Sequence, residues 1–290
     1  NDLLEKGHID YIIKRAISLG ADPITAVKVA CHNAARYFLL NNRGAIAPGY
    51  LADFAIVEDL KGFHVVTVYK RGKRVYHDGI VEDFPLPEIP EHLNKRAHDT
   101  FHLPVLSPAD FANTRLRGVI GMVPGQIITE DAGYAAGVDV SKDILKMAVV
   151  ERHKNTRHIG IGYLKGYGLR SGAVATSVAH DSHNIICVGT NDEDMAFAVN
   201  RIARNRGGIV VVENGQVLAE LPLEIAGIIS GKPLREVNTL LEDAKKAAHA
   251  LGVGTDIDPF MTLSFMSLPV IPTLRLTTRG VVDVNTQQYV

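Results

Sequence analysis

The densest group of polar side chains in the sequence lies between two apolar stretches, residues 173–178 and 185–188. It is made of His180, Asp181, Ser182, His183 and Asn184. Imidazole, carboxylate, hydroxyl and amide groups at the end of a strand can position a ligand, so these five residues are candidates for a substrate pocket. The same composition also fits a hydrogen-bonded turn that caps a strand. A Ser–His–Asp triad is not expected, because neighbours in sequence seldom converge as nucleophile, base and orienting group.

The twelve histidines do not otherwise suggest a metal centre. His98 and His102 are four residues apart, as in a helical zinc pair, but the glutamate of the HExxH pattern is absent and the segment is proline-rich. His153 and His158 flank a basic turn and are expected to face solvent. There is no Cys-x-x-Cys pair. The sequence therefore predicts no metal ligand within this chain and identifies no catalytic residue.

Glycines recur between residues 160 and 172, but not as a GxGxxG loop with a strand before it and a helix after it. Gly160 to Gly166 alternates small and apolar residues instead. Without its structural context the phosphate-binding motif is weak. Closely packed strands, or a loop that passes near a ligand, explain the glycines better.

The bulk composition is that of an ordinary globular protein. The 290 residues suggest about two domains, and 31 basic against 32 acidic residues leave a formal net charge of −1. That balance gives no reason to expect a nucleic-acid or membrane partner. Two cysteines are too few for a disulfide framework, and no apolar run reaches membrane-spanning length. The first residues lack the apolar core of a signal peptide and an initiator Met, so we expect a cytoplasmic chain that is a fragment or a processed piece.

Local patterns predict helices and a hairpin in the first part of the chain. Apolar residues at helical spacing indicate a helix over 9–19, and Asp22-Pro23 begins a second one over 23–35. A buried strand is predicted at 53–57. The run 65–77, with a turn at Arg71-Gly72-Lys73, indicates a hairpin.

The remaining two thirds predict an α+β arrangement. Residues 84–108 are proline-rich and expected to be irregular. Strands are predicted at 143–150 and 184–188, a hairpin through Asn214-Gly215, and helices over 193–206 and 237–251. Residues 261–269 alternate apolar and small polar residues and are expected to be a core-filling strand or loop.

Several longer strings go beyond generic patterns. Residues 7–10 (Gly-His-Ile-Asp), 33–36 (Asn-Ala-Ala-Arg), 44–53, 179–184, 189–195 and 258–265 resemble the bacterial adenine deaminases of the amidohydrolase superfamily. The resemblance extends over essentially the whole chain. It implies α/β and α+β folds: the last αα segment of a (β/α)8 barrel (1–40), a small β-domain (41–83), a connection (84–104) and an α+β C-terminal domain (105–290).

The resemblance also implies a function. The family hydrolyses adenine to hypoxanthine and ammonia with a divalent metal, Mn²⁺ or Fe²⁺, which activates water near neutral pH. The family's metal ligands have no counterpart in this chain, so we expect an inactive C-terminal half whose partners are adenine, the N-terminal barrel half and further copies of itself in a homodimer or other homo-oligomer. The alternatives are a non-catalytic purine-binding or structural module, one half of a split deaminase, or a different hydrolase of the superfamily.

Overall fold

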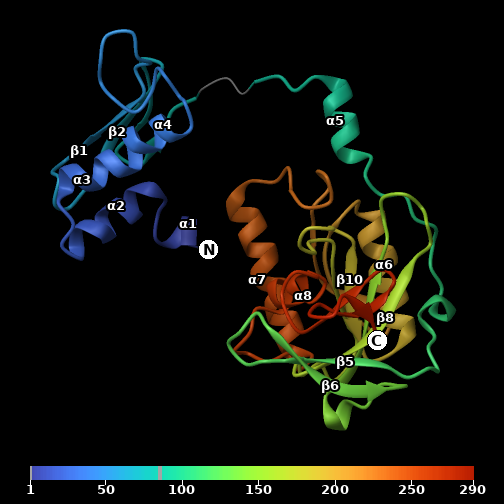
Figure 1. Ribbon diagram of the computed structural model, residues 1–290. Coiled ribbons are helices and arrows are strands. Elements are labelled where there is room, and N and C mark those ends of the chain that lie inside the picture. The colour runs from blue at the N-terminus through green and yellow to red at the C-terminus, as the bar shows by residue number, and fades with distance from the viewer. Residues whose placement is uncertain (1, 84–86) are drawn as a thin grey trace. The chain divides into compact units, whose positions relative to one another are not determined.

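The computed structural model describes residues 2–83 and 87–290 (Figure 1). The chain divides into two compact units, Asn1–Glu88 and Ile89–Val290. The connection predicted over 84–104 starts at residues 84–86, which lie outside the described residues. The four-part domain division stays a prediction.

The first unit begins with short helices. They are α1 (Asp2–Glu5), α2 (Ile9–Ser18), α3 (Pro23–Lys28), the π-helical turn η1 (Val29–Asn33) and α4 (Ala34–Tyr37). The Asp22 carboxylate caps α3 by accepting a hydrogen bond from the Thr25 N–H at 2.8 Å. Both predicted helices are confirmed, although the second contains the π-turn. Only Ile13 and Ala35 are buried hydrophobic residues here, whereas Ile12 and Ile24 are about 60% exposed.

A four-stranded antiparallel sheet completes this unit. Its strands are β1 (Phe54–Val57), β2 (Val65–Lys70), β3 (Lys73–His77) and β4 (Ile80–Val81), in that order. The predicted hairpin is confirmed, with Arg71 and Gly72 at positive φ in its turn. The prediction that β1 is buried is wrong: Ala55 and Ile56 are exposed, Ile56 by 48%, and Phe54 and Val57 are half-buried.

The second unit is built on an eight-stranded mixed sheet with the order β12-β11-β9-β10-β7-β8-β5-β6. Only β5 and β8 pair in parallel. The strands are β5 (Arg117–Met122), β6 (Thr129–Ala135), β7 (Ile144–Val150), β8 (Ile159–Lys165), β9 (Ala173–Thr176), β10 (Ile185–Gly189), β11 (Gly208–Glu213) and β12 (Gln216–Pro222). The predicted strands at 143–150 and 184–188 and the Asn-Gly hairpin are confirmed.

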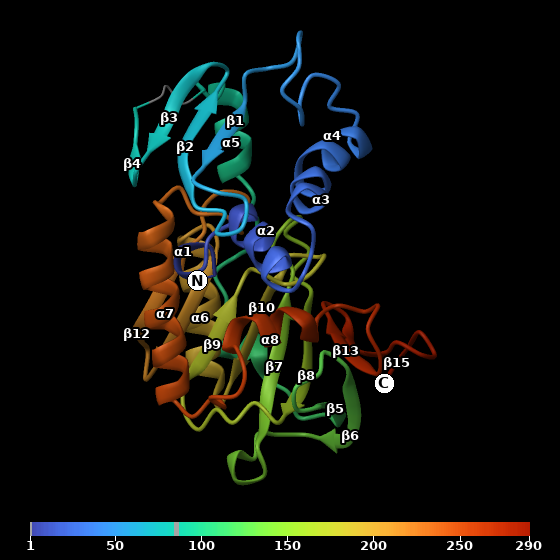
Figure 2. The same ribbon diagram turned by 90° about the vertical axis from the view of Figure 1, so that its left-hand side faces the viewer.

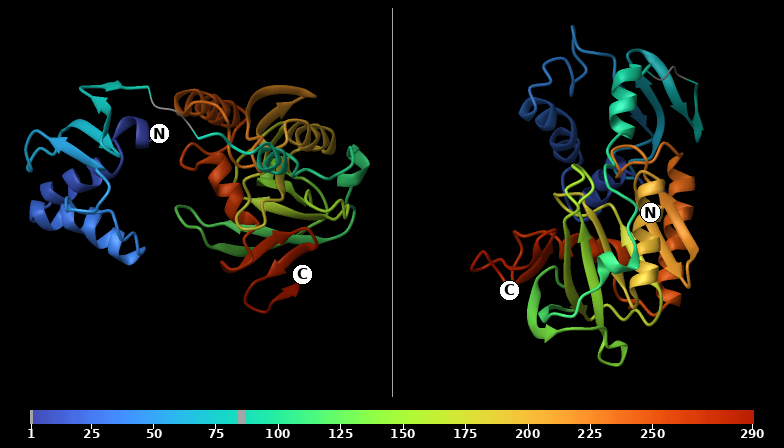
Figure 3. Two further views of the ribbon diagram at one scale, coloured as in Figure 1. Left: turned by 90° about the horizontal axis from the view of Figure 1, so that it is seen from above. Right: turned by 90° about the vertical axis from the view of Figure 1, so that its right-hand side faces the viewer.

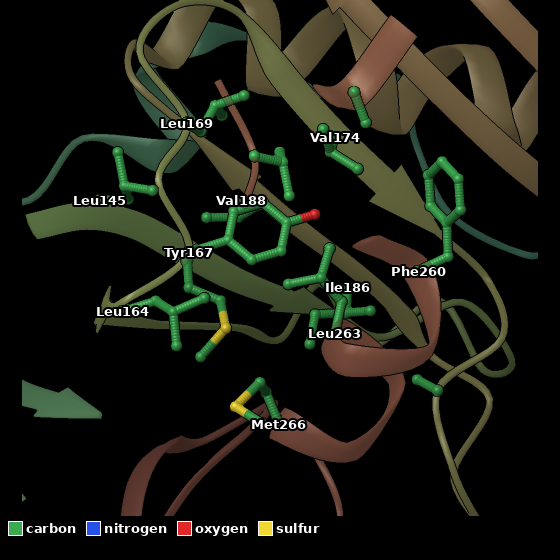
Figure 4. Close-up of a cluster of buried hydrophobic side chains, with 14 of the residues drawn as sticks. Leu145, Leu164, Tyr167, Leu169, Val174, Ile186, Val188, Phe260, Leu263 and Met266 are labelled. Atoms are coloured by element: carbon green, nitrogen blue, oxygen red, sulfur yellow. The ribbon is translucent and has the colours of Figure 1, made fainter. Parts of the chain in front are cut away.

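Helices cover both faces of the central strands (Figure 2). Successive residues of a strand point to opposite faces, and the two cores follow this alternation. Met147 and Val149 of β7 join α7 (Leu234–Ala250) and α8 (Pro259–Met266) in one core, which is shown in Figure 4. Ala148 and Val150 join α6 (Asp192–Arg204) in the other. The helices predicted over 193–206 and 237–251 are confirmed.

A small antiparallel sheet at the C-terminal end packs on the large one (Figure 3). It consists of β13 (Leu274–Thr277), β14 (Gly280–Asp283) and β15 (Gln288–Tyr289). A Cβ atom on Gly160 would lie 1.8 Å from the Thr277 carbonyl oxygen, and one on Gly162 would lie 2.6 Å from Val281. The glycines of β8 therefore permit close strand packing, as one of the two sequence interpretations predicted.

Two sequence predictions in this unit are wrong. The segment expected to be irregular, residues 84–108, contains helix α5 (Glu91–His98). The short 3-10 helices η2 (Pro108–Phe111) and η3 (Val140–Lys142) follow it in the chain. Residues 261–269 were expected to be a strand or loop, but residues 261–266 belong to helix α8, which the Asp258 carboxylate caps by accepting from the Phe260 and Met261 N–H groups. Among the described residues, no helix is long and apolar enough to cross a membrane.

Candidate functional site

The five predicted pocket residues lie on one turn that joins β9 to β10. Because β10 pairs antiparallel with β7, the turn lies at the sheet end where β7 finishes: Ile185 is opposite Val150. The same end receives the start of β11, since Ile209 is opposite Thr176. Sheet pairing thus brings segments distant in sequence close to residues 180–184.

Hydrogen bonds fix the base of this turn. The buried Ser177 hydroxyl donates to the Gly227 carbonyl at 2.6 Å and accepts from the Gly208 N–H at 2.8 Å. Further along, the His180 N–H donates to the Ser264 carbonyl at 3.1 Å and the His183 N–H to the Ala179 carbonyl at 2.6 Å. The prediction of a hydrogen-bonded turn is therefore confirmed, and it is compatible with a role in a pocket.

Arg152, two residues beyond the end of β7, is the buried support of the turn. Its side chain is 1% exposed. Nε donates to the His183 carbonyl at 2.6 Å, Nη1 to the Thr100 carbonyl at 2.7 Å, and Nη2 to the Ala226 carbonyl at 2.9 Å. Burial lowers its pKa to about 10, which leaves the guanidinium charged at neutral pH. One cation thus joins three separate segments through backbone carbonyls.

His183 is the least conventional residue of the turn. Its φ of 46° lies in the left-handed region, where non-glycine residues are uncommon. Burial, followed by the charges of Arg152 and His180, lowers the pKa of His183, while Asp181 opposes the shift. The imidazole is therefore neutral at pH 7 and offers one donor and one acceptor. Its Nδ1 atom and the Asn184 Oδ1 atom are buried without a hydrogen-bond partner among the described residues.

Two of the other three side chains are more accessible. Asp181 and Ser182 are exposed. His153 is exposed, as predicted, and its Nε2 atom also lies 2.8 Å from the Ser182 carbonyl oxygen of the turn. The His180 ring packs against Phe265 of α8 with centroids 4.6 Å apart. The turn therefore presents a carboxylate, a hydroxyl and two imidazoles around a rigid base.

Phe265 also lines a cavity of about 320 Å³. Its walls come from the loop 122–128, from Gly166, and from residues of α8 and of the segment just before it. Asp256 and Asp258 are among these lining residues. This is the lower end of the size range of small-molecule pockets. Residues 180–184 do not line this cavity. They meet it only through the His180–Phe265 contact.

No three His, Cys, Asp or Glu residues in the described part of the chain come together in a way that could hold a metal ion. His98 ends α5 and its Nδ1 atom is 2.8 Å from the Asn94 carbonyl oxygen, whereas His102 follows the helix in an extended segment. The two do not form a helical pair. The donor set of the described residues does not fit the metal that the amidohydrolase resemblance implies, so no chemical step is assigned to such a metal here.

Sequence reasoning identified the turn and missed its supports. Arg152 was not singled out, and Phe265 was placed in the wrong kind of element. The available signal for Arg152 was its place two residues after a run of six buried strand residues, because buried arginines need several acceptors. Thr100 carried no such signal.

Comparison with known proteins defines the class of the chain. Residues 3–75 match the amidohydrolase family. Residues 126–288 match the family described as adenine deaminase C-terminal domain, which is more than half of the chain. The chain belongs to this adenine deaminase C-terminal domain family.

Relatives named adenine deaminase match almost the whole chain. Those of Nitratidesulfovibrio vulgaris, Dehalococcoides mccartyi and Desulfatibacillum aliphaticivorans are 46%, 43% and 43% identical to it. The alignments cover 99%, 98% and 100% of this chain but 51%, 51% and 52% of the relatives. The chain thus spans about half the length of the curated relatives it matches. Their names do not favour a purely structural or binding module.

Proposed function

We propose that this chain is the C-terminal half of an adenine deaminase, which converts adenine and water to hypoxanthine and ammonia. The observation that carries the proposal is the match of nearly the entire chain to relatives named adenine deaminase at 43–46% identity. The amidohydrolase match over 3–75 supports residues 1–40 as the end of a barrel whose remainder the N-terminal half supplies. The cation of the complete enzyme, manganese or iron, would then be held by residues of that half.

In this proposal the turn 180–184 forms part of the adenine pocket. The purine edge carries one exocyclic amine donor and ring-nitrogen acceptors. The exposed Asp181 carboxylate can accept from the amine, and the neutral His183 imidazole can donate to a ring nitrogen or accept from the amine. The unpartnered Nδ1 and Oδ1 atoms of His183 and Asn184 support a role that is completed only when a ligand or the other half is present.

The first test is a reconstitution. The 290-residue chain is assayed for conversion of adenine to hypoxanthine with added manganese, alone and after mixing with the matching N-terminal half. Activity only in the mixture is expected. Activity of the chain alone would contradict the absence of metal ligands, and activity in neither, with both halves folded and bound to each other, would refute the deaminase assignment.

A second test addresses the turn. In the reconstituted enzyme, His183→Asn should lower kcat/KM for adenine by about five- to thirtyfold, because one hydrogen bond to the substrate is worth about 1–2 kcal/mol. Asparagine tolerates the positive φ, so folding is preserved. His158→Asn, at an exposed histidine before β8, is the matched control and should leave kcat/KM unchanged. Equal kinetics of the two variants would remove the turn from the pocket.

A further inference from the structure

A second cavity, of about 680 Å³, lies in the second unit between α5 and the C-terminal end of α6. Its lining contains the cationic side chains Lys95, Arg204 and Arg206 together with His98, and Asp99 is the single acidic residue. This excess of positive charge lies in a chain whose formal net charge is −1. A concave surface lined by one sign of charge concentrates the field and attracts ions of the opposite sign.

These cations are not paired within the described chain. Neither Lys95, Arg204 nor Arg206 has a carboxylate within 4.0 Å there. The Glu220 carboxylate accepts hydrogen bonds from Arg201 at 2.6 and 2.7 Å and from Asn205 at 2.8 Å. The Arg204 charge contributes to lowering the pKa of Glu220 but is not bonded to it. The cavity therefore has charge in excess of what its neighbours neutralise.

The walls of the cavity are held in place. The Ala97 carbonyl at the end of α5 accepts from the Ala226 N–H at 2.6 Å, and the His102 N–H donates to the Arg152 carbonyl at 2.7 Å. Between them, the Phe101 ring lies over the Arg152 guanidinium, with 4.2 Å from Cζ to the ring centroid, and contributes to the cavity lining. An aromatic side chain thus lies among the cations at a fixed position.

We propose that this cavity binds a nucleoside monophosphate. Lys95, Arg204 and Arg206 receive the phosphate, since ammonium and guanidinium groups are the usual phosphate partners. Phe101 provides apolar contact for the base. The volume is within the range of small-molecule sites. The inference does not depend on the deaminase assignment, because it concerns a separate group of residues and involves no chemical step.

Isothermal titration of the 290-residue chain with adenosine monophosphate tests the proposal, with inorganic phosphate and adenosine as separate arms. Adenosine monophosphate should bind more tightly than either arm, and added salt should weaken it. Lys95→Gln and Arg204→Gln should each weaken binding about three- to tenfold, a range that corresponds to the loss of one partly exposed charge contact. Both side chains are exposed, so the variants should fold, which circular dichroism checks.

Arg96→Gln is the matched control, because Arg96 is exposed on the same helix but does not line the cavity. It should change the affinity less than twofold. Absence of binding at millimolar nucleotide, or an equal loss in Arg96→Gln, would overturn the site. Equal affinity for inorganic phosphate would overturn the nucleoside part. Displacement of the nucleotide by adenine would place the binding in the proposed adenine pocket and also overturn the assignment.

Discussion

Replacement of Arg152 by methionine should cost the second unit about 3–5 kcal/mol of unfolding free energy, because three buried carbonyl acceptors lose their donor. Methionine keeps most of the volume of the side chain but leaves the carbonyls of His183, Thr100 and Ala226 without their donor. Each buried carbonyl that loses its partner costs about 1–3 kcal/mol, and relaxation or entry of water reduces the sum.

Urea unfolding followed by circular dichroism and tyrosine fluorescence measures this loss, since the chain has nine tyrosines and no tryptophan. With a slope of about 2–3 kcal/mol/M for this size, the midpoint should fall by about 1–2 M. Arg275→Met is the matched comparison. Arg275 is equally buried and burial also lowers its pKa to about 10, but it donates only to Ile127 and Pro272 and leaves Nε and Nη1 unpartnered.

Removing Arg275 therefore also removes two buried unpaired donors, so its net cost should stay below about 1.5 kcal/mol. The contrast between the two variants tests the reasoning, because the two arginines are alike in burial and charge and differ in hydrogen bonding and in the contact of Arg152 with the Phe101 ring. If Arg152→Met loses no more stability than Arg275→Met, the three-carbonyl account of the turn is refuted.

Three further predictions concern other parts of the chain. By NMR, the His183 imidazole should titrate below pH 6.5, and Asp181→Asn should lower that midpoint further. Because the unfolded state then binds the proton more readily, the folding stability should fall as the pH drops below 6.5. The fall should be smaller in His183→Asn. Gly160→Ala should destabilise the second unit by at least about 2 kcal/mol in urea, since its Cβ would overlap the Thr277 carbonyl, whereas Gly137→Ala should be nearly neutral. Hydrogen bonds from the Lys70 side chain and the Arg71 N–H lower the pKa of Asp53. Asp53 should therefore stabilise the first unit above pH 4 and lose this effect as the pH falls through its folded-state pKa. Thermal unfolding of Asp53→Asn should show a weaker dependence on acid pH.

The sequence predicted elements well where a local pattern determines them. The Asn214-Gly215 turn needs positive φ at both positions, which these residues accept, and the hairpin forms around it. Asp22-Pro23 predicted a helix start correctly. Asp258-Pro259 is the same signal and was overlooked, because α8 is apolar on all sides and shows no helical periodicity. Helix α5 was missed for the opposite reason, since it is polar and has no buried residue.

The candidate site was only half predictable. The composition of residues 180–184 identified the turn, because adjacent polar residues between strands are visible locally. Its supports were not visible. The partners of Arg152 are 31, 52 and 74 residues away in sequence, and they meet it only because β7, β10 and β11 end at the same side of one sheet. No local pattern encodes such a contact.

The same geometry explains why both proposed binding regions lie near one another. Helices α6, α7 and α8 cover the two faces of the central strands, so polar groups can gather only where the strands end. At the end of β7, Arg152 holds the turn 180–184 through the His183 carbonyl, the segment before η2 through Thr100, and the Phe101 ring through its guanidinium face. A ligand that packs against Phe101 would therefore lie next to Arg152, the residue that positions His183. If both proposals hold, the nucleotide cavity and the adenine pocket share a single buried cation as their common support.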